Sequence, residues 1–358
     1  MMNSNKTNSI DSALAKFSFG VESRTSLYRK IAAFLSNGEP IHDVIKALKY
    51  EYYKLNKRDF RVLILGGIEE DMSYGSSFSE AISKWVPASE LLIIKAGEES
   101  SDLSSAMKDA VEVTMATKQM KSAVFGKMAY PTVLMLLFLV LMFIFSTTAI
   151  PQISATLDPK SWPPLGQMLY GFSTFIQNYW LHCIVAFTVT SIMISKTMPT
   201  YTGRWRKYLD KLPPWSIYQT MQSSTFLLAV AAMLKSGTPI SESLHMMRDN
   251  SEHYVSKQIQ VMIDKLVIEA ETPGEAMRTS FLDVETGVDI AIYDKSNSLE
   301  TALDSIGREA IHNGIGSVSK ASAIANVVVL LSIGLYVGVT YFAIFQITQA
   351  AQTQMNMM

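Results

Sequence analysis

Charge is scarce in this sequence and absent from long stretches of it. Only 18% of the 358 residues are Asp, Glu, Lys or Arg, whereas ordinary soluble domains carry about 25%. Between residues 128 and 195 the only charged side chains are Asp158 and Lys160, and residues 321–358 contain none. This distribution excludes an ordinary soluble protein of two domains.

Other features are missing as well. The single cysteine, Cys183, cannot form an internal disulfide, which excludes a disulfide-stapled secreted scaffold. The 31 basic and 32 acidic residues leave no basic excess for nucleic-acid binding. The sequence contains no phosphate-binding GxxxxGK[ST] loop, and its five histidines form no HExxH pattern. The sequence therefore predicts no enzyme, no nucleic-acid partner, no metal site and no cofactor.

Three apolar segments are long enough to cross a membrane. A bilayer core of about 30 Å requires roughly 20 apolar helical residues, and residues 128–150, 178–198 and 321–348 meet this requirement. The alternative, a buried helix in a soluble core, is strongest for the second segment, which is rich in Thr and Ser. Because core helices rarely stay uncharged for so long, we interpret all three as transmembrane helices.

The basic residues around these segments predict one orientation. Lys118, Lys121 and Lys127 precede the first span, and only Lys160 follows it before the second. A basic run begins with Lys196 at the end of the second span and continues to Lys211 beyond it, and no basic residue follows the third span. Cytoplasmic loops carry the excess of Lys and Arg, so we expect a cytoplasmic N-terminus and a periplasmic C-terminus.

The ends and the outer loop are polar or short. Residues 1–22 form a polar tail without the apolar stretch of a cleavable signal peptide. On the opposite side of the membrane we expect a periplasmic loop at 151–177 and a periplasmic tail at 349–358.

The two remaining regions, 23–127 and 199–320, are repeats of each other. Residues 33–45 (AFLSNGEPIHDVI) and 232–244 (AMLKSGTPISESL) match at a constant offset of 199. In both copies an apolar stripe with helical spacing precedes the turn and another follows it. Each region is therefore predicted to be a helical bundle.

Four turn residues carry the repeat. Gly38 and Gly237 suit the left-handed position that ends a helix. Pro40 and Pro239 suit the first turn of the next helix, where a missing N–H costs nothing. These residues predict the same helix–turn–helix unit in both regions.

A second, weaker match lies downstream. Gly97, Glu98 and Leu103 of the first copy correspond to Tyr293, Asp294 and Leu299 of the second. Glu98, Glu99 and Asp102 form an acidic cluster that we interpret as partner-facing. The alternatives are solvated residues near a helix N-terminus, which favours acidic side chains, and a Ca²⁺ site, although the spacing fits no EF-hand.

These features together resemble the inner-membrane platform family of type II secretion and type IV pilus systems. The family's leucine–x–x–glycine–x–proline–leucine turn is matched by residues 35–41 and 234–240. Its glycine–glutamate–x–x–glycine–x–leucine element is matched at Gly97, Glu98 and Leu103, with Ser101 in place of the second glycine. The loose motifs are similar to the type IVb branch, which includes conjugative thin pili and bundle-forming pili.

The resemblance implies an all-α membrane protein with two homologous cytoplasmic helical bundles and three transmembrane helices. It also implies a function: coupling a cytoplasmic hexameric ATPase to extraction and polymerisation of pilin or pseudopilin. The implied partners are this assembly ATPase, the pilin, other inner-membrane assembly proteins, and further copies in a homodimer or small homo-oligomer.

Three other functions fit parts of the sequence. A small transporter usually carries its repeats inside the membrane, whereas these repeats lie outside it. An intramembrane enzyme needs paired ionisable groups, and the spans offer only His182 and Cys183. A membrane-anchored signalling scaffold would need neither a motor nor a pilin.

Overall fold

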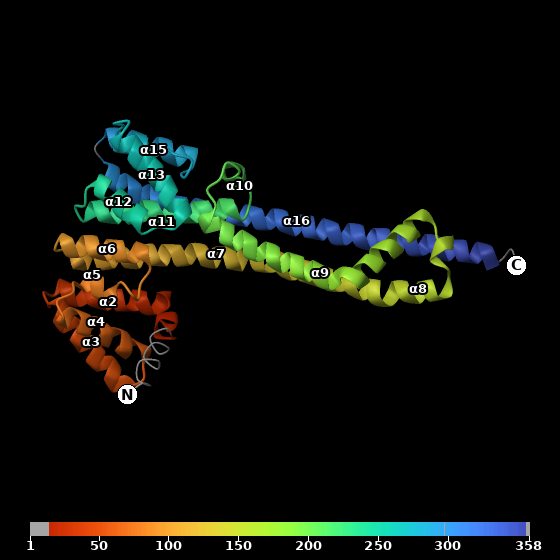
Figure 1. Ribbon diagram of the computed structural model, residues 1–358, viewed down its shortest axis with the longest axis horizontal. Coiled ribbons are helices and arrows are strands. Elements are labelled where there is room, and N and C mark those ends of the chain that lie inside the picture. The colour runs from red at the N-terminus through yellow and green to blue at the C-terminus, as the bar shows by residue number, and fades with distance from the viewer. Residues whose placement is uncertain (1–13, 297, 356–358) are drawn as a thin grey trace. The chain divides into compact units, whose positions relative to one another are not determined.

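The computed structural model describes residues 14–296 and 298–355, and every element within these ranges is a helix (Figure 1). The expected all-α fold is therefore confirmed. Residues 1–13, 297 and 356–358 lie outside the described ranges. Most of the expected N-terminal tail (1–22) and the end of the expected C-terminal tail (349–358) are therefore not described. Asn297, which lies between Asp294 and Leu299 of the downstream motif, is also not described.

The first repeat consists of five helices followed by the start of a long one. They are α2 (Val21–Ser36), α3 (Ile41–Leu55), α4 (Phe60–Ser73), α5 (Phe78–Ile82), α6 (Ala88–Glu99) and α7 (Leu103–Ile144). Capping side chains fix several of the starts. Asp59 accepts the amide of Arg61 before α4, and Ser77 forms a capping box with Glu80 before α5.

The second repeat has the same succession. A short helix, α10 (Arg206–Leu209), precedes it. Its helices are α11 (Trp215–Lys235), α12 (Ile240–Asp249), α13 (His253–Val267), α14 (Pro273–Ala276), α15 (Val284–Lys295) and α16 (Leu299–Met355). In chain order, α2 to α7 of the first repeat correspond to α11 to α16 of the second.

The chain divides into two compact units. The first comprises the residues up to 122 together with 198–315, and the second comprises 123–197 with 316–358. The first unit holds both repeats, and their buried side chains form one continuous cluster, in which Ile31 and Ile45 of the first repeat join Phe226 and Phe281 of the second. The two predicted helical bundles therefore share one core.

This core begins earlier in the chain than composition suggested. Ala15 and Phe19, which belong to the segment interpreted as a polar tail, are 3% and 1% exposed and pack into the core. Average composition did not reveal these two core residues, because only the side chains that face the core need to be apolar.

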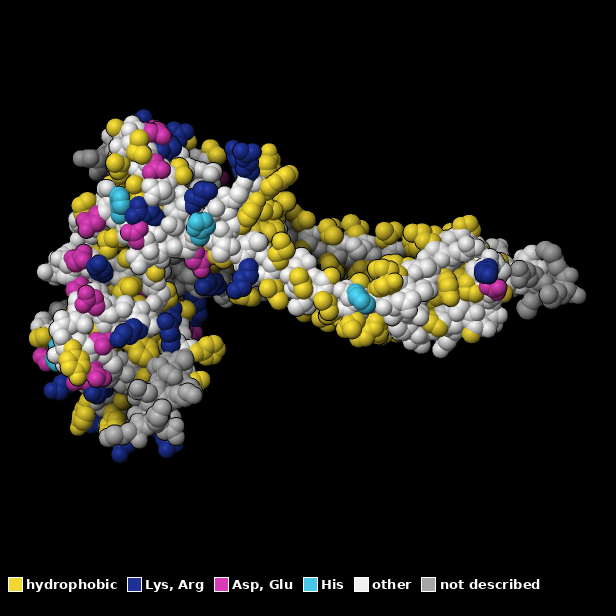
Figure 2. Space-filling view, viewed as in Figure 1, with side chains coloured by type: hydrophobic (Ala, Val, Ile, Leu, Met, Phe, Trp, Pro, Cys, Tyr) yellow, Lys and Arg dark blue, Asp and Glu magenta, His cyan; other side chains and the backbone are white. Residues whose placement is uncertain are grey.

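The second unit contains the apolar parts of three helices. Helical residues 103–156, 164–200 and 299–353 are long and apolar enough to cross a membrane. The space-filling view shows hydrophobic side chains and very few charged ones on the visible face of this unit (Figure 2). The region expected as an outer loop, 151–177, is largely helical, because α8 (Ile150–Thr156) and the first turns of α9 (Pro164–Thr200) occupy it.

Two features order the second unit internally. A π-helical turn, η1 (Phe145–Ala149), interrupts the regular hydrogen bonds of the first apolar helix. The carbonyl of Ser146 in this turn accepts the Ser173 hydroxyl of α9 at 2.8 Å. Trp162, 2% exposed, packs with Leu169 and Ile347 into a second, small core.

Candidate functional site

The repeated turn has the same backbone geometry in both copies. Gly38 has a φ of +86° and Gly237 a φ of +85°, a conformation that costs glycine little and other residues much. The amide of each glycine donates to the carbonyl three residues earlier, at 3.0 and 2.8 Å. Pro40 and Pro239 each immediately precede the first residue of the next helix, α3 or α12. The turns thus set the same helix pairing in each repeat.

The downstream acidic residue also has the same role in both copies. The carboxylate of Glu98 accepts the amides of Phe78 and Ser79, at 2.7 and 2.9 Å, at the start of α5. The carboxylate of Asp294 accepts the amide of Gly274 at 2.9 Å at the start of α14. In both copies the acid lies 20 residues after the first amide it binds. Each acid therefore caps a short helix of its own repeat.

The other two members of the predicted acidic cluster face solvent. Glu99 and Asp102 are exposed. The Asp102 carboxylate accepts the Ser105 amide at 3.1 Å at the start of α7, and Glu99 lies 3.8 Å from the Lys95 ammonium. Glu98 is committed to its cap, so a partner could meet only Glu99 and Asp102 of this cluster.

Ser101 occupies the position of the second glycine in the family motif. Its φ is +60°, in the left-handed region where a residue with a Cβ is disfavoured and glycine is not. The family motif therefore has glycine at this position because glycine adopts a positive φ without strain. In this chain Ser101 adopts the same left-handed conformation at a higher conformational energy.

Charged residues connect the two repeats within the first unit. The ammonium of Lys235 in α11 donates to Asp109 of α7 at 2.9 Å, and Arg308 of α16 pairs with Glu112 of α7. Together with Asp304 these side chains border a cavity of about 220 Å³. The hydrogen bond to Asp109 raises the pKa of Lys235 above its usual value. The seam between the repeats is thus held by paired charges.

The Lys235–Asp109 pair should contribute measurably to stability. We expect Asp109→Lys and Lys235→Asp each to destabilise the protein, and the double exchange to restore most of the loss, with a coupling of about 1 kcal/mol. Asp109 is only 13% exposed, so solvent screens the pair incompletely. Denaturant titration of the purified protein in detergent measures the four free energies of unfolding.

The matched control for this pair is Lys54–Glu51, a pair within one helix whose side chains are 54% and 66% exposed. Exchanging its charges should change stability by less than about 0.5 kcal/mol. Equal coupling energies for the two pairs would contradict a special role for the seam.

A buried arginine organises the start of the second repeat. The side chain of Arg206 is 5% exposed, and its Nε donates to Asp210 at 2.7 Å. The guanidinium carbon lies 3.8 Å from the centre of the Tyr254 ring in α13, a cation–π contact. The Tyr254 hydroxyl donates to the other oxygen of Asp210 at 3.1 Å. Burial and the charge of Asp210 raise the pKa of Tyr254, which therefore stays a neutral donor.

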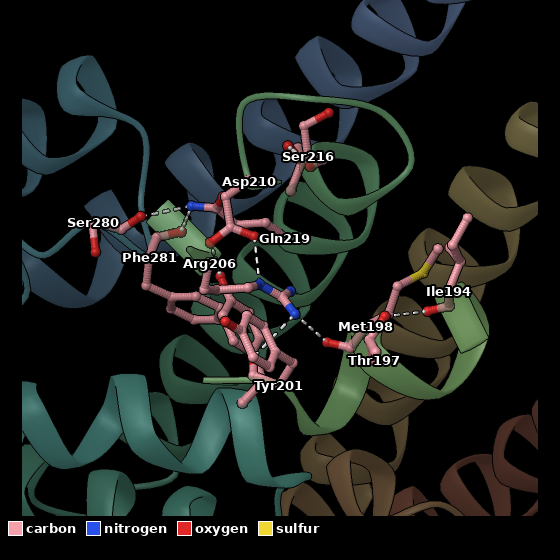
Figure 3. Close-up of polar contacts among 12 residues, drawn as sticks. Ile194, Thr197, Met198, Tyr201, Arg206, Asp210, Ser216, Gln219, Ser280 and Phe281 are labelled. Atoms are coloured by element: carbon pink, nitrogen blue, oxygen red, sulfur yellow. Dashed lines mark hydrogen bonds and ion pairs between the residues drawn. The ribbon is translucent and has the colours of Figure 1, made fainter. Parts of the chain in front are cut away.

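The same guanidinium binds the end of α9. Its Nη1 donates to the Met198 carbonyl at 2.7 Å and to the Tyr201 carbonyl at 3.3 Å (Figure 3). Met198 belongs to the last turn of α9, where carbonyls lack partners within the helix and positive charge is favourable. Nearby, the Gln219 amide donates to the Ser280 and Phe281 carbonyls. Arg206 therefore joins the end of an apolar helix to α10 and α13.

Nothing in the sequence distinguishes Arg206 from the other basic residues after the second span. Orientation needs only the number of Lys and Arg residues there, and a buried cation looks the same in sequence as an exposed one. The available signals were the nearby aromatic residues, which are common at membrane interfaces, and an acidic residue four positions later, a spacing that also occurs in exposed helical ion pairs.

No metal centre is formed by the part of the chain that the structure describes, since none of its His, Cys, Asp and Glu residues gather in groups of three or more that could hold an ion. Cys183 is exposed on α9. The notable arrangements in the described residues are two matched turns, two matched caps, the charged seam and the Arg206 contact.

Comparison with known proteins gives matches over most of the chain. The family described as type II secretion system protein F matches twice, over residues 27–151 and 226–347. The toxin coregulated pilus biosynthesis protein E of Vibrio cholerae is 23% identical over 327 residues, which cover 90% of this chain and 95% of that protein.

Two further relatives are named as type IV pilus assembly proteins. TapC of Aeromonas hydrophila is 22% identical over 78% of this chain and 69% of its own length. PilC of Pseudomonas aeruginosa is 20% identical over 89% of this chain and 88% of its own length. Each family match covers most of one repeat and the apolar helical segment that follows it.

Proposed function

Because the chain belongs to the type II secretion system protein F family of inner-membrane platform proteins, we propose that it couples a cytoplasmic hexameric ATPase to extraction and polymerisation of pilin or pseudopilin. The named relatives act in pilus assembly, which favours a type IV pilus over a secretion pseudopilus. In this proposal the protein is not an enzyme, and its energy comes from the motor.

One observation carries the proposal: the helices that build the repeats continue into the apolar spans. Helix α7 runs unbroken from Leu103 to Ile144, and α16 from Leu299 to Met355. A continuous helix transmits displacement along its axis, because backbone hydrogen bonds link its successive turns. In α7 the internal Pro131 removes one of these bonds without ending the helix. Pilin extraction needs such an input, since each apolar CH₂ leaving the lipid costs about 0.8 kcal/mol.

The orientation and partners follow from the same proposal. The Lys and Arg distribution favours a cytoplasmic N-terminus and a periplasmic C-terminus, which puts both repeats on the side of the motor. The exposed Glu99 and Asp102 are proposed as contacts for a partner. We also propose a homodimer or small homo-oligomer that contacts other inner-membrane assembly proteins.

Interrupting α7 between the two units tests the coupling. Inserting Gly-Ser-Gly-Ser after Ser122 should leave both units folded and inserted but break the continuous helix, and we expect surface pili to disappear. Immunoblots of sheared pilin and co-purification with the assembly ATPase measure the outcome. Loss of pili with the ATPase still bound is the expected result.

The same insertion after Gly75 is the matched control, because Gly75 lies in an exposed turn with a φ of +96°. This variant should assemble pili normally. Wild-type piliation from the Ser122 insertion would refute mechanical coupling through α7. Substrate flux into proteoliposomes without any pilus defect would instead favour a transporter.

A further inference from the structure

A cleft lies between the two repeats within the first unit. Its volume is about 340 Å³, in the lower part of the range of about 300–1,000 Å³ that is usual for small-molecule sites. Helix α6 of the first repeat packs against α11 of the second, and both helices border the cleft together with α7 and the start of α13. Leu92, Met247 and Val255 contribute buried apolar side chains to its wall. The cleft therefore has the size and the mixed lining of a small-molecule site.

Two helices begin at this cleft without a side-chain cap. Helix α6 follows Pro87 and α13 follows Glu252, and in neither case does a side chain accept the first amides of the helix. Residues 87–90 and 250–252 border the cleft. The first amides of a helix have no partner within the helix, and the dipole makes this end positive. Both helix starts therefore favour an anion.

The equivalent helices of the other copy do have a cap. Helix α13 corresponds to α4, which is capped by Asp59, and α6 corresponds to α15, which is capped by Asp283. The preceding pairs agree between the copies: α2, α3, α11 and α12 all lack a side-chain cap, whereas α5 and α14 both have one. In the two pairs that differ, the helix without a cap is the one that begins at the cleft.

A buried hydroxyl in the wall of the cleft also lacks a partner. Thr114 of α7 is 3% exposed and borders the cleft, and its Oγ1 makes no hydrogen bond. Thr117, one turn later, donates its hydroxyl to the Val113 carbonyl at 2.8 Å, as threonines within helices commonly do. Leaving a buried hydroxyl without a partner costs free energy. A bound molecule with an acceptor oxygen would remove this cost at Thr114.

The same face of α7 carries two lysines. Lys118 and Lys121 follow Thr114 at intervals of four and three residues, so all three lie on one side of the helix, and all three border the cleft. Lys121 is exposed, and Lys118 pairs with the exposed Glu22 at 2.6 Å. The lysines add positive charge to a cleft at which two helices begin.

The two carboxylates at the cleft already have partners. Glu90 accepts the Nε and Nη2 of Arg24 at 2.9 and 3.1 Å and the Tyr28 hydroxyl at 2.7 Å. Glu252 accepts the Tyr218 hydroxyl at 2.8 Å. The charge of Glu90 is therefore compensated by Arg24, and the two lysines outnumber the remaining acid.

We propose that this cleft binds a small phosphate-bearing molecule, whose oxygens accept the free amides at the helix starts and the Thr114 hydroxyl. Phosphate suits these groups, because its oxygens accept strongly from backbone amides at helix N-termini and from lysine. The inference goes beyond the proposed function, since it concerns a ligand between the repeats and requires neither motor nor pilin.

Calorimetric titration of the purified full-length protein in detergent tests the site. The probes are inorganic phosphate, AMP, short-chain phosphatidylglycerol, and adenosine as the control without phosphate. We expect one AMP to bind per chain, inorganic phosphate to compete with it, and adenosine not to bind. Binding of phosphatidylglycerol in place of the two soluble probes would support the same phosphate site, with a lipid headgroup as the source of the phosphate.

Two variants connect the binding to the cleft. Thr114→Val keeps the shape of the side chain and removes its hydroxyl, so it should weaken AMP binding several-fold. It should not lower the free energy of unfolding of the ligand-free protein, because this hydroxyl has no hydrogen bond to lose. Lys121→Gln should weaken AMP binding by about tenfold, the effect of losing one charge-assisted hydrogen bond. The matched control is Lys108→Gln, which changes an exposed lysine of α7 that does not border the cleft and should bind AMP like the wild type.

The inference is wrong if none of the three phosphate-bearing probes binds, or if adenosine binds as tightly as AMP. Equal affinities of Thr114→Val, Lys121→Gln and Lys108→Gln would also overturn it, because the binding would then lie elsewhere. These measurements involve no pilus, so their failure is distinguishable from a failure of the proposed coupling.

Discussion

Replacing Arg206 with methionine is expected to destabilise the second repeat by about 3–5 kcal/mol, because it leaves a buried carboxylate without its cation. Asp210 is 14% exposed and would keep only its hydrogen bond from Tyr254 among the side-chain contacts described above. The Met198 carbonyl at the end of α9 would also lose its donor. Denaturant titration in detergent measures the loss, and hydrogen exchange should show faster opening of α13.

Two further variants separate charge from geometry at this position. Arg206→Lys keeps the charge but replaces a fork of donors with a single ammonium, so it should recover only part of the stability. Adding Asp210→Asn to Arg206→Met should restore a further part, because the uncompensated charge is then gone.

The control for Arg206 is Arg204→Met, since Arg204 is exposed two residues away in the same basic run. It should change stability by no more than about 0.5 kcal/mol. If the two methionine variants were equally stable, Arg206 would serve only as one of the charges that orient the protein.

Much of the architecture could be predicted from the sequence. Long uncharged runs leave few alternatives to membrane helices, and the matches of the family confirm the resemblance drawn from the repeated turn. The glycine and proline of the turn are predictable because glycine tolerates a positive φ and proline fixes φ at a helical value. Local chemistry of this kind does not depend on distant parts of the chain.

Contacts between distant residues were not predictable in the same way. Glu98 looked available to a partner because the amides it binds lie 20 residues earlier in the chain. The shared core depends on α6 meeting α11, and periodicity shows that a helix has an apolar face but not what covers it. The observed helix ends also differ from the expected ones. Helix α9 begins at Pro164, well before the apolar segment expected at 178–198.

The glycine of the downstream motif has a packing role that can be tested directly. A Cβ on Gly97 would lie 2.0 Å from the Cβ of Ala106 in α7 and 3.1 Å from the Asp102 carbonyl. Ala106 is fully buried, so neither helix can yield without opening the core. We expect Gly97→Ala to destabilise the protein by about 3 kcal/mol, and to reduce piliation if coupling requires an intact first repeat.

Ala106→Gly should rescue much of this loss, because it removes the atom that the new Cβ would strike. The control is Gly66→Ala in α4, where the nearest atom to a new Cβ is the Lys49 Cδ at 3.9 Å. Gly66→Ala should leave the free energy of unfolding unchanged or raise it by up to about 1 kcal/mol, because alanine has the higher helix propensity and the new Cβ meets no close atom. In the second repeat the equivalent residue, Tyr293, is largely exposed, so this close helix contact is specific to the first repeat. Similar losses at Gly97 and Gly66, or no rescue by Ala106→Gly, would show that the close approach of α6 to α7 is not what requires glycine.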